Sequence, residues 1–514
     1  MYLTEKLERE VRGLKQERQS TAVITPSSGI QSTPGENATS TLRSSIVSTE
    51  SLTSIPSITQ GSARAEAVAA IDDLVSLPRE FLSTLAELWF KENQPWCPIL
   101  NPDQIRTALA DLPDPVDHIP DVVLRAVISM QIAYSSAAIS LGYRGRRRLS
   151  LHLRSEVLSE ALTNFTLSSL QALLVTAILD YGSDDISSTF SLMAVCRRKC
   201  EQLGLFRKLL SHIEDQNPSH VGPPARDAFG GAELALPLSW ATLALDATSS
   251  LGITWRDASA ALVDHLSSIA YTSIHNYRDS FRQHVHLCAI GLQPLHQFIN
   301  EHEKGRYALG PQEALDVCDE IYQNFMTYIH SQPTQTYSLL ADGAIDFDVN
   351  TVLTYILAYC AIILLYSRLC TFNTGVTDIP EHRSLQAYEG LVTTMRNISD
   401  ADAELNSPLM SSFLFLALRL KLVQYRKLSQ PREASFDILM HSLNMCGRRW
   451  PIARRADLVL RAAVLEVDTG MSTPLPAVFW DLRKSHLEIS EETKEWIMQY
   501  RPSLFVGSLN GAYV

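Results

Sequence analysis

The segment LSSLQALLVTAILDYG, residues 167–182, indicates the fold class most directly. Apolar side chains cover most of the circumference of a helix built from it, and such a helix is buried on all sides in a larger domain. Ser168 or Ser169 is expected to cap its N-terminus, because a serine hydroxyl accepts a backbone N–H there. Its C-terminal end is expected at Tyr181-Gly182. The stretch therefore predicts the central helix of a helical core.

A second apolar stretch, VNTVLTYILAYCAIILLYS at Val349–Ser367, contains 19 residues without a charge. That length is near the lower limit for a membrane span. Three tyrosines within the stretch, and the charged Asp348 and Arg368 at its ends, favour a buried helix of a large helical core instead. No membrane attachment is expected.

Helical spacing of apolar residues continues along the chain beyond about residue 66. Leu82, Leu85 and Trp89 follow one another at spacings of three and four, and Asp121 is expected to cap the start of another helix. Further helices are predicted at about 189–203, 236–250, 275–302, 311–331, 350–370, 405–428, 433–446 and 451–466. Segments with the alternation typical of strands are nearly absent. The fold class is therefore predicted to be all-α, in one large multi-helix domain.

The N-terminal part of the chain differs from the rest in composition. Residues 1–19 predict a short charged helix, in which apolar residues at spacings of four and three form one coiled-coil seam. Residues 20–65 predict a disordered linker, because twenty of the 43 residues from 20 to 62 are Ser or Thr and none is aromatic. Such a segment buries too little apolar surface to offset the entropy of ordering it. The helical domain is expected to span residues 66–514.

The charge balance and the cysteines exclude several classes of protein. The 514 residues contain 44 Lys or Arg and 56 Asp or Glu, a net charge of −12. A chain that coats nucleic acid needs a concentrated positive field, so this balance argues against that role. The eight cysteines are scattered without a CxxC pair, which is ordinary for an intracellular protein and excludes a disulfide scaffold. The first residues also lack the apolar region of a secretory signal.

The sequence contains no motif of the common enzyme classes that we considered: a phosphate-binding loop, a glycine-rich dinucleotide turn, a GxSxG elbow or an HExxH pair. His284, His286 and Cys288 are of types that bind metals, but residues two apart on a helix point about 200° apart and cannot share an ion. Cys196 and Cys200 share a helix face without a second pair nearby, and are expected to be packed thiols. We therefore expect no catalytic residue, no enzymatic activity and no resident metal or cofactor in this chain.

The densest basic run consists of Arg144, Arg146, Arg147 and Arg148. It is a candidate for nuclear import or phosphate contact. A solvated loop between two helices is the favoured interpretation, because most runs of charged residues belong to solvent-exposed surface. Residues 487–498 interleave acidic and bulky apolar side chains; an ordinary amphipathic helix is favoured there over a segment that recruits partner proteins.

Four stretches of the chain follow one another in a recognisable order. They are LWFKENQPWCPIL at 88–100, LSSLQALLVTAILDYG at 167–182, FSLMAVCRRKCEQLGLFRK at 190–208 and LSWATLALDATSSLG at 238–252. This ordered set resembles the middle homology region of fungal zinc-cluster (binuclear zinc) transcription factors, also called the fungal-specific transcription factor domain. The match covers about residues 80–370. The resemblance implies a helical regulatory domain and gives structural roles to the motif residues Pro98, Gln171, Leu203, Gly204, Leu205, Trp240 and Asp246.

The chain also departs from the family's pattern. Phe206 stands where the family usually has His or Asn, and residues 230–233 replace an Arg-rich approach to the Trp-containing helix. The six-cysteine zinc cluster that binds DNA in the family has no counterpart here, and the first cysteine is Cys97. The family places that cluster before a short dimerising coiled coil, which residues 1–19 resemble. We therefore interpret the chain as a truncated family member or as one that has lost its DNA-binding part, with zinc expected only where such a module exists.

The function implied by the resemblance is that of a nuclear regulator of transcription, acting on a metabolic or secondary-metabolite gene set. Its expected partners are a second chain bound through the N-terminal helix, as a homo- or heterodimer, the transcription machinery or co-regulators, and a small-molecule effector. DNA would be reached only through a missing module or a partner. Two alternatives stay open: an all-helical enzyme or binding protein for a small apolar molecule, and an interaction scaffold that does not bind DNA.

Overall fold

The structure divides the chain into two units, Met1–Asp72 and Asp73–Val514, and every described residue belongs to the second. The computed structural model describes residues 76–205, 232–251, 279–303, 310–331, 337–339, 345–372, 378–399, 402, 406–470, 475 and 477–483. The coiled coil predicted at 1–19, the linker predicted at 20–65 and the acidic stretch at 487–498 therefore lie outside the described residues.

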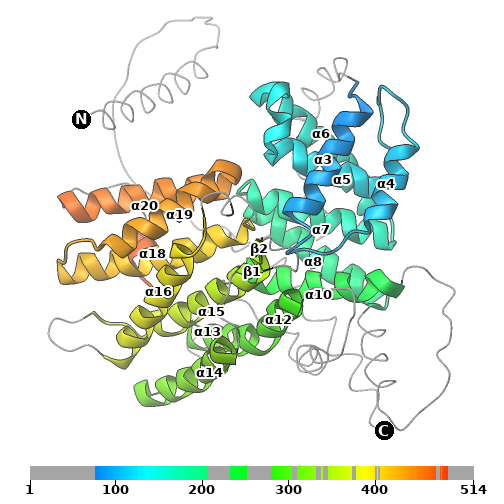
Figure 1. Cartoon of the computed structure of the whole chain (residues 1–514). Coiled ribbons are helices and arrows are strands. Elements are labelled where there is room, and N and C mark those ends of the chain that lie inside the picture. Colours follow the sequence, from blue (N-terminus) through cyan, green and yellow to red (C-terminus); the bar gives the residue numbers. More distant parts are fainter. Residues whose placement is uncertain are drawn as a thin grey trace, which may run out of the picture. The chain divides into compact units, whose positions relative to one another are not determined.

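The prediction of an all-α fold is confirmed (Figure 1). The first group of helices is α3 (Arg79–Glu92), α4 (Pro102–Ala110), α5 (Val122–Tyr134), α6 (Gly142–Ala161), α7 (Leu167–Gly182) and α8 (Ile186–Gln202), with a 3₁₀ turn η2 (Ser136–Leu141) between α5 and α6. Asp121 caps α5 as predicted, accepting the Leu124 N–H at 2.7 Å. The helix predicted at 189–203 also ends as expected, since Gly204 follows it with φ of 65°.

The second group of helices follows along the chain. It comprises α10 (Ala232–Ser249), α12 (Asp279–Leu287), α13 (Gln293–Glu303), α14 (Pro311–Ser331), α15 (Val349–Ser367), α16 (Ile379–Arg396), α18 (Leu409–Leu428), α19 (Ala434–Arg449) and α20 (Pro451–Thr469), with a 3₁₀ turn η4 (Ala477–Trp480). The strands of the described residues are β1 (Tyr337–Leu339) and β2 (Ile345–Phe347), which pair antiparallel with Tyr337 opposite Phe347. The single helix predicted at 275–302 is interrupted by a π turn at Cys288–Leu292.

Helix α7 is the centre of the first group. All of its residues from Ser169 to Gly182 are buried, and it packs against α5, α6, α8 and α20. The predicted serine cap is wrong. Thr166 caps the helix instead, since its hydroxyl oxygen accepts the Ser169 N–H at 3.0 Å.

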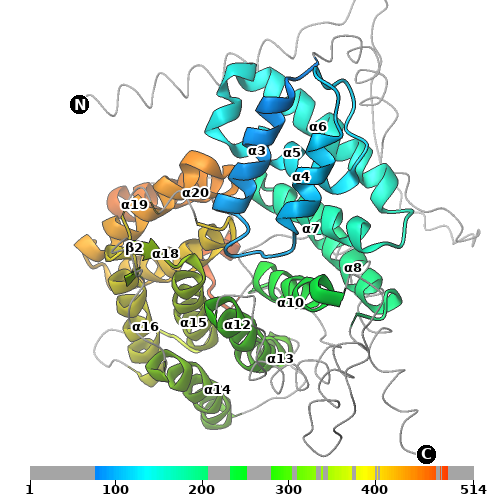
Figure 2. The ribbon, with the colours of Figure 1, turned by 45° about the vertical axis from the view of Figure 1, so that its right-hand side comes forward.

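Helix α15 has the same central place in the second group. Figure 2 shows it between α12 and α16, and it also packs against α18. Among the described residues, α15 is a helix that is long and apolar enough to cross a membrane. Helix α5 and the segment of η2 and α6 pass the same test only when they are taken together as one bent pair. Because 89% of the apolar window of α15 is buried within the domain, its composition is that of a core helix.

Candidate functional site

A charged groove of about 1130 Å³ opens between two parts of the chain that are distant in sequence. One wall comes from α3, α5, α6 and α7, and the other from the junction of α19 and α20. The charged residues that line it are Lys91, Glu92, Arg146, Arg147, Arg154, Asp180, Asp185, Asp402, Arg448, Arg449 and Arg454. Seven of them are cationic and four are carboxylates, so the groove is positive although the chain has a net charge of −12.

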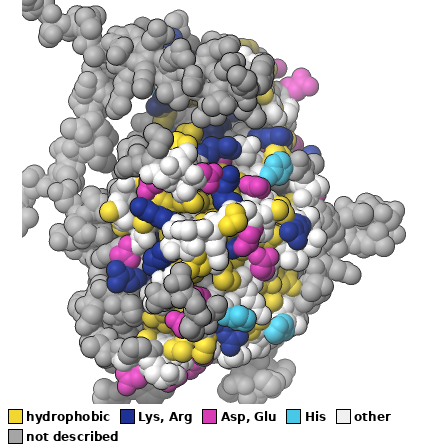
Figure 3. Space-filling model, turned by 90° about the vertical axis from the view of Figure 1, so that its left-hand side faces the viewer, with side chains coloured by type: hydrophobic (Ala, Val, Ile, Leu, Met, Phe, Trp, Pro, Cys, Tyr) yellow, Lys and Arg dark blue, Asp and Glu magenta, His cyan; other side chains and the backbone are white. Residues whose placement is uncertain are grey.

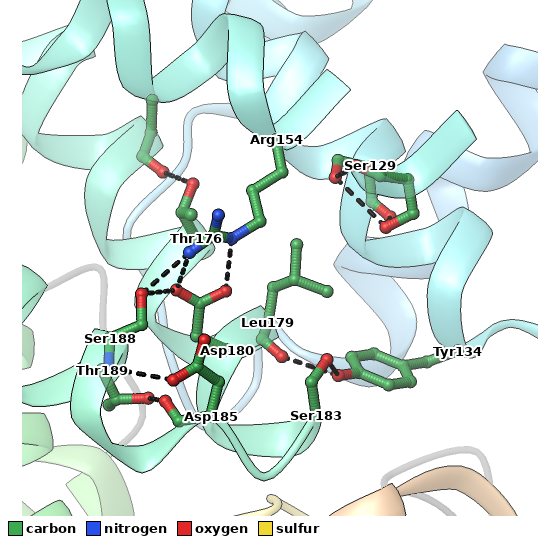
Figure 4. Close-up of polar contacts among 12 residues, drawn as sticks. Ser129, Tyr134, Arg154, Thr176, Leu179, Asp180, Ser183, Asp185, Ser188 and Thr189 are labelled. Atoms are coloured by element: carbon green, nitrogen blue, oxygen red, sulfur yellow. Dashed lines mark hydrogen bonds and ion pairs between the residues drawn. The ribbon is translucent and has the colours of Figure 1, made fainter. Parts of the chain in front are cut away.

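A partly buried ion pair between Arg154 of α6 and Asp180 of α7 lines the groove (Figure 4). Arg154 donates two hydrogen bonds to the Asp180 carboxylate, each of 2.6 Å, and the Ser188 hydroxyl of α8 donates a third of 2.6 Å. Burial raises the pKa of Asp180, while these three bonds stabilise the carboxylate and oppose that rise. The contact therefore connects α6, α7 and α8 at one point.

Asp185, beside this pair, is engaged with its own helix. Its carboxylate accepts the Ser188 N–H at 3.0 Å, and so caps the start of α8. Its backbone carbonyl accepts the Thr189 hydroxyl at 2.9 Å (Figure 4). This carboxylate therefore serves the local structure of α8.

Tyr134 joins the two walls at the end of α5. Its hydroxyl donates to the Leu179 carbonyl at 2.6 Å and lies 2.6 Å from the Ser183 hydroxyl (Figure 4). Its ring packs edge-on against Trp450 at the start of α20, with 4.6 Å between the ring centroids. Burial raises the pKa of Tyr134, so the phenol is neutral and acts as a donor.

The arginine run predicted as a solvated loop is helical, so that prediction is wrong. Arg144, Arg146, Arg147 and Arg148 all lie in the first turns of α6. Arg146 is partly buried, and its guanidinium donates to the carbonyls of Ile132, Ala133 and Ser135, at 2.9, 2.8 and 3.0 Å. It therefore satisfies the carbonyl groups that the end of α5 leaves without helical partners. The other three arginines of the run are exposed.

Arg146 and Arg454 both line the groove and are close enough for the charge of one to act on the other. Arg454 donates to the Gly447 carbonyl at 2.6 Å and to the Arg448 carbonyl at 3.5 Å. Burial lowers the pKa of Arg146, and the positive charge of Arg454 lowers it further. Arg147 and Lys91, which also line the groove, form no hydrogen bond or ion pair with any part of the chain that the structure describes. This is the part of the groove where positive charge is least compensated.

The rim of the groove is apolar. Ile139, Tyr143 and Leu151 line it with exposed fractions of 64%, 78% and 52%. Isolated exposed apolar residues are common, but three of this size beside one charged groove form a mixed surface that suits an amphipathic ligand.

The motif residues of the family resemblance lie elsewhere in the domain, and none of them lines this groove. Gln171 of α7 is buried and donates to the Ile99 carbonyl at 2.7 Å, in the loop that also holds the buried Pro98. Asp246 of α10 forms a buried ion pair with Arg197 of α8. Trp240 is buried on α10, and Leu203, Gly204 and Leu205 form the end of α8. The two polar contacts thus connect the first matched stretch to the second, and the third to the fourth.

The metal-capable residue types lie in the core. His284 of α12 is buried, with Nδ1 at 3.1 Å from the Thr354 hydroxyl and Nε2 at 3.8 Å from the Cys288 sulfur. Cys196 and Cys200 are buried thiols, and the Cys200 sulfur lies 3.5 Å from the Thr242 hydroxyl. Among the described residues, no three His, Cys, Asp or Glu side chains are close enough to hold one metal ion.

The arginines of the second wall were not predicted from the sequence. Residues 448–455, RRWPIARR, contain four arginines around Pro451. A proline that follows a helix and is favoured at the first position of the next one marks a helix junction. Two basic pairs at such a junction, considered together with the run in α6, are the signal by which the groove could have been found.

Comparison with curated proteins finds a distant relative of this chain. This chain is similar to the transcriptional coactivator of the notoamide biosynthesis cluster from Aspergillus versicolor, with 23% identity over 359 residues. The aligned region is 65% of this chain and 64% of the relative, so the chain matches less than two thirds of that protein's length. No family model matches the chain. No solved structure matches it either.

Proposed function

We propose that this chain is a regulator of transcription of the fungal zinc-cluster type, which acts as a coactivator in the nucleus on a metabolic or secondary-metabolite gene set. The observation that carries the proposal is the similarity over 359 residues to a coactivator named for a biosynthesis cluster. The order of the four stretches at 88–100, 167–182, 190–208 and 238–252 supports it independently. In this proposal the helical domain is regulatory and has no enzymatic activity.

The proposed mechanism rests on the cysteine spacing and the net charge of the chain. Its 514 residues contain no CxxC pair of the kind that the zinc cluster uses, and their net charge of −12 does not favour binding to DNA. We propose that it reaches promoters through a partner protein, as a homo- or heterodimer through residues 1–19 or through co-regulators. Binding of an effector or partner would then shift the helical domain between states that hide or expose an activating surface.

The test is a tethered reporter assay in a fungal host. The full chain is fused to a heterologous DNA-binding domain, and transcription of a reporter with the matching binding sites is measured. We expect reporter transcription to change several-fold with the fusion and to stay at background with the untethered chain. A nuclear fusion that leaves transcription unchanged would contradict the proposal.

DNA binding is tested separately. In a gel-shift assay with the purified chain and promoter fragments of the affected genes, we expect no specific complex at nanomolar protein concentrations. Specific nanomolar binding by the chain alone would show that it reads DNA itself, and would remove the partner-dependent mechanism.

The alternative of a binding protein or enzyme for a small apolar molecule has weaker support. An apolar pocket lies between Trp96, Met193 and Leu409, but its volume is about 10 Å³, the space of a single water molecule. Turnover of a pathway intermediate by the purified chain would revive this alternative. The scaffold alternative predicts that the chain stays in the cytosol and has no effect on the reporter.

A further inference from the structure

From the convergence of Arg146, Arg147 and Arg454 with two uncapped helix N-termini, we propose that the groove binds a small organic molecule with clustered oxyanions, such as a phosphate ester or a polycarboxylate. The inference goes beyond the role in transcription and does not depend on it. Four features of the groove carry it: the helix ends, the guanidinium partners, the state of the carboxylates and the apolar rim.

The first feature is the pair of helices that begin at the groove. Helix α6 begins at Gly142 and α20 at Pro451, and neither has a side-chain cap or an acidic residue in its first turn. The N-terminus of a helix carries a partial positive charge. Most backbone N–H groups at these two ends are engaged, since Gly142 donates to the Ile139 carbonyl, Pro451 has no N–H, and Ala453 and Arg454 donate to the Trp450 carbonyl. Both helices carry an arginine close to this end, Arg146 in one and Arg454 in the other, and the two guanidiniums bond carbonyls at the ends of α5 and α19. An anion between them would be attracted by both guanidiniums and by the positive ends of α6 and α20.

The second feature is the set of partners of these guanidiniums. Within the part of the chain that the structure describes, Arg146 and Arg454 donate only to backbone carbonyls, which do not neutralise a positive charge. The lowered pKa of Arg146 has burial as its larger cause and repulsion by Arg454 as its second. Arg147 and Lys91 line the same groove and form no hydrogen bond or ion pair with another residue that the structure describes. Guanidinium groups bind phosphate and carboxylate with paired hydrogen bonds, so these groups are suited to such a ligand.

The third feature is that the four carboxylates of the groove are already engaged. Asp180 is held by Arg154, and Asp185 caps α8. Glu92 pairs with Arg449 at 2.8 Å. Asp402 accepts the Ser399 hydroxyl at 2.6 Å. The carboxylates therefore belong to the walls, and the positive charge of Arg146, Arg147 and Arg454 is left for a ligand.

The fourth feature decides the size and character of the ligand. The groove has about 1130 Å³, much more than one phosphate fills and slightly above the usual range of small-molecule sites, about 300–1000 Å³. Ile139, Tyr143 and Leu151 offer an exposed apolar rim for the uncharged part of the molecule. A long polyanion would need positive charge beyond the groove. The face seen in Figure 3 instead shows acidic, basic and apolar side chains interspersed, which favours a small ligand.

The test uses the full chain, with pyrophosphate and citrate as probes and sodium chloride of equal ionic strength as the reference. Thermal unfolding and isothermal titration calorimetry measure binding. The test variant is Arg147→Gln, because Arg147 is exposed, lines the groove and has no described partner. The matched control is Arg148→Gln, the exposed neighbour on the same helix that does not line the groove.

We expect at least one probe to raise the unfolding temperature above the chloride reference. Arg147→Gln should weaken its binding roughly tenfold, the effect of one charge-assisted contact, while Arg148→Gln leaves it unchanged. Stronger binding of pyrophosphate would assign a phosphate ligand, and stronger binding of citrate a carboxylate ligand. No binding of either probe, equal weakening in both variants, or binding of an acidic peptide alone would overturn the proposal.

Discussion

Arg197 of α8 and Asp246 of α10 form an ion pair inside the domain, with side-chain exposed fractions of 4% and 9%. Two further nitrogens of the Arg197 guanidinium, Nε and Nη2, are buried without a hydrogen-bond partner among the described residues. Arg197 comes from the third stretch of the family resemblance and Asp246 from the fourth. The pair therefore connects two sequence motifs through a contact whose loss would leave a buried charge.

Asp246→Ala is expected to lower the free energy of unfolding by about 3–5 kcal/mol, because it leaves the Arg197 guanidinium buried and unpaired. Urea denaturation followed by circular dichroism measures this. Asp468→Ala removes a partner from the half-exposed pair with Arg432 and should cost less than about 1 kcal/mol. Similar costs for the two variants would contradict the buried character of the first pair.

Gln171→Leu tests the contact between the first two stretches. The change removes the 2.7 Å hydrogen bond to the Ile99 carbonyl and leaves that carbonyl without this donor in the core. We expect a loss of about 1–3 kcal/mol in the free energy of unfolding. Gln312→Leu, which alters an exposed contact within α14, should change it by less than about 0.5 kcal/mol. The urea midpoints of the two variants are compared with that of the unmodified chain.

The sequence predicted the helices that are apolar enough to be recognised without knowledge of their neighbours. Helices α7 and α15 are buried on nearly all sides, so their composition alone indicates the core. Helix α6 was missed because its first turns contain glycine and arginine and its buried residues include the small Ser150 and Ala161. Helix α16 was missed because it buries polar residues, among them Glu381 and Ser384, which weaken the apolar periodicity.

The groove could not be predicted from local pattern, because its walls come from residues about 300 positions apart. In the sequence, Arg146 is one of several arginines in a run that we interpreted as solvent-exposed. In the structure it bonds the carbonyl groups at the end of α5, which give it a structural role. Arg454 acquires its neighbour Arg146 only when α20 packs near α7. Tertiary packing therefore determines which of the arginines line one site.

Gly182→Ala tests how closely α7 approaches the start of α20. A Cβ at Gly182 would lie 2.6 Å from the Trp450 ring and 3.1 Å from the Tyr134 hydroxyl. We expect a loss of about 1–3 kcal/mol in the free energy of unfolding, the cost of overpacking a core. Gly145→Ala is the matched control in α6, where the nearest atom would be 3.8 Å away. It should raise the free energy of unfolding by about 0.5–1 kcal/mol, because alanine is the better helix former. Destabilisation by both would argue against close packing as the cause.

Protonation of His284 at acidic pH is expected to lower the free energy of unfolding. Burial lowers the pKa of His284 to about 4, from an ordinary value near 6.5. Below pH 6.5 the unfolded chain therefore binds a proton at His284, whereas the folded chain binds it only when the pH falls to about 4. The contribution of neutral His284 to stability is fully present above pH 6.5 and is lost as the pH falls from 6.5 to about 4.

Between pH 7 and pH 5, this group should lower the free energy of unfolding by about 2 kcal/mol. His284→Gln removes the titration while keeping a donor for the Thr354 hydroxyl, which lies 3.1 Å from Nδ1. Urea unfolding at pH 7 and pH 5 measures both proteins. We expect the loss of stability between these values to be about 2 kcal/mol smaller in the variant, since the remaining titrating groups are common to both. Equal losses would mean that His284 is protonated in the folded chain, and that the core around α12 admits a positive charge.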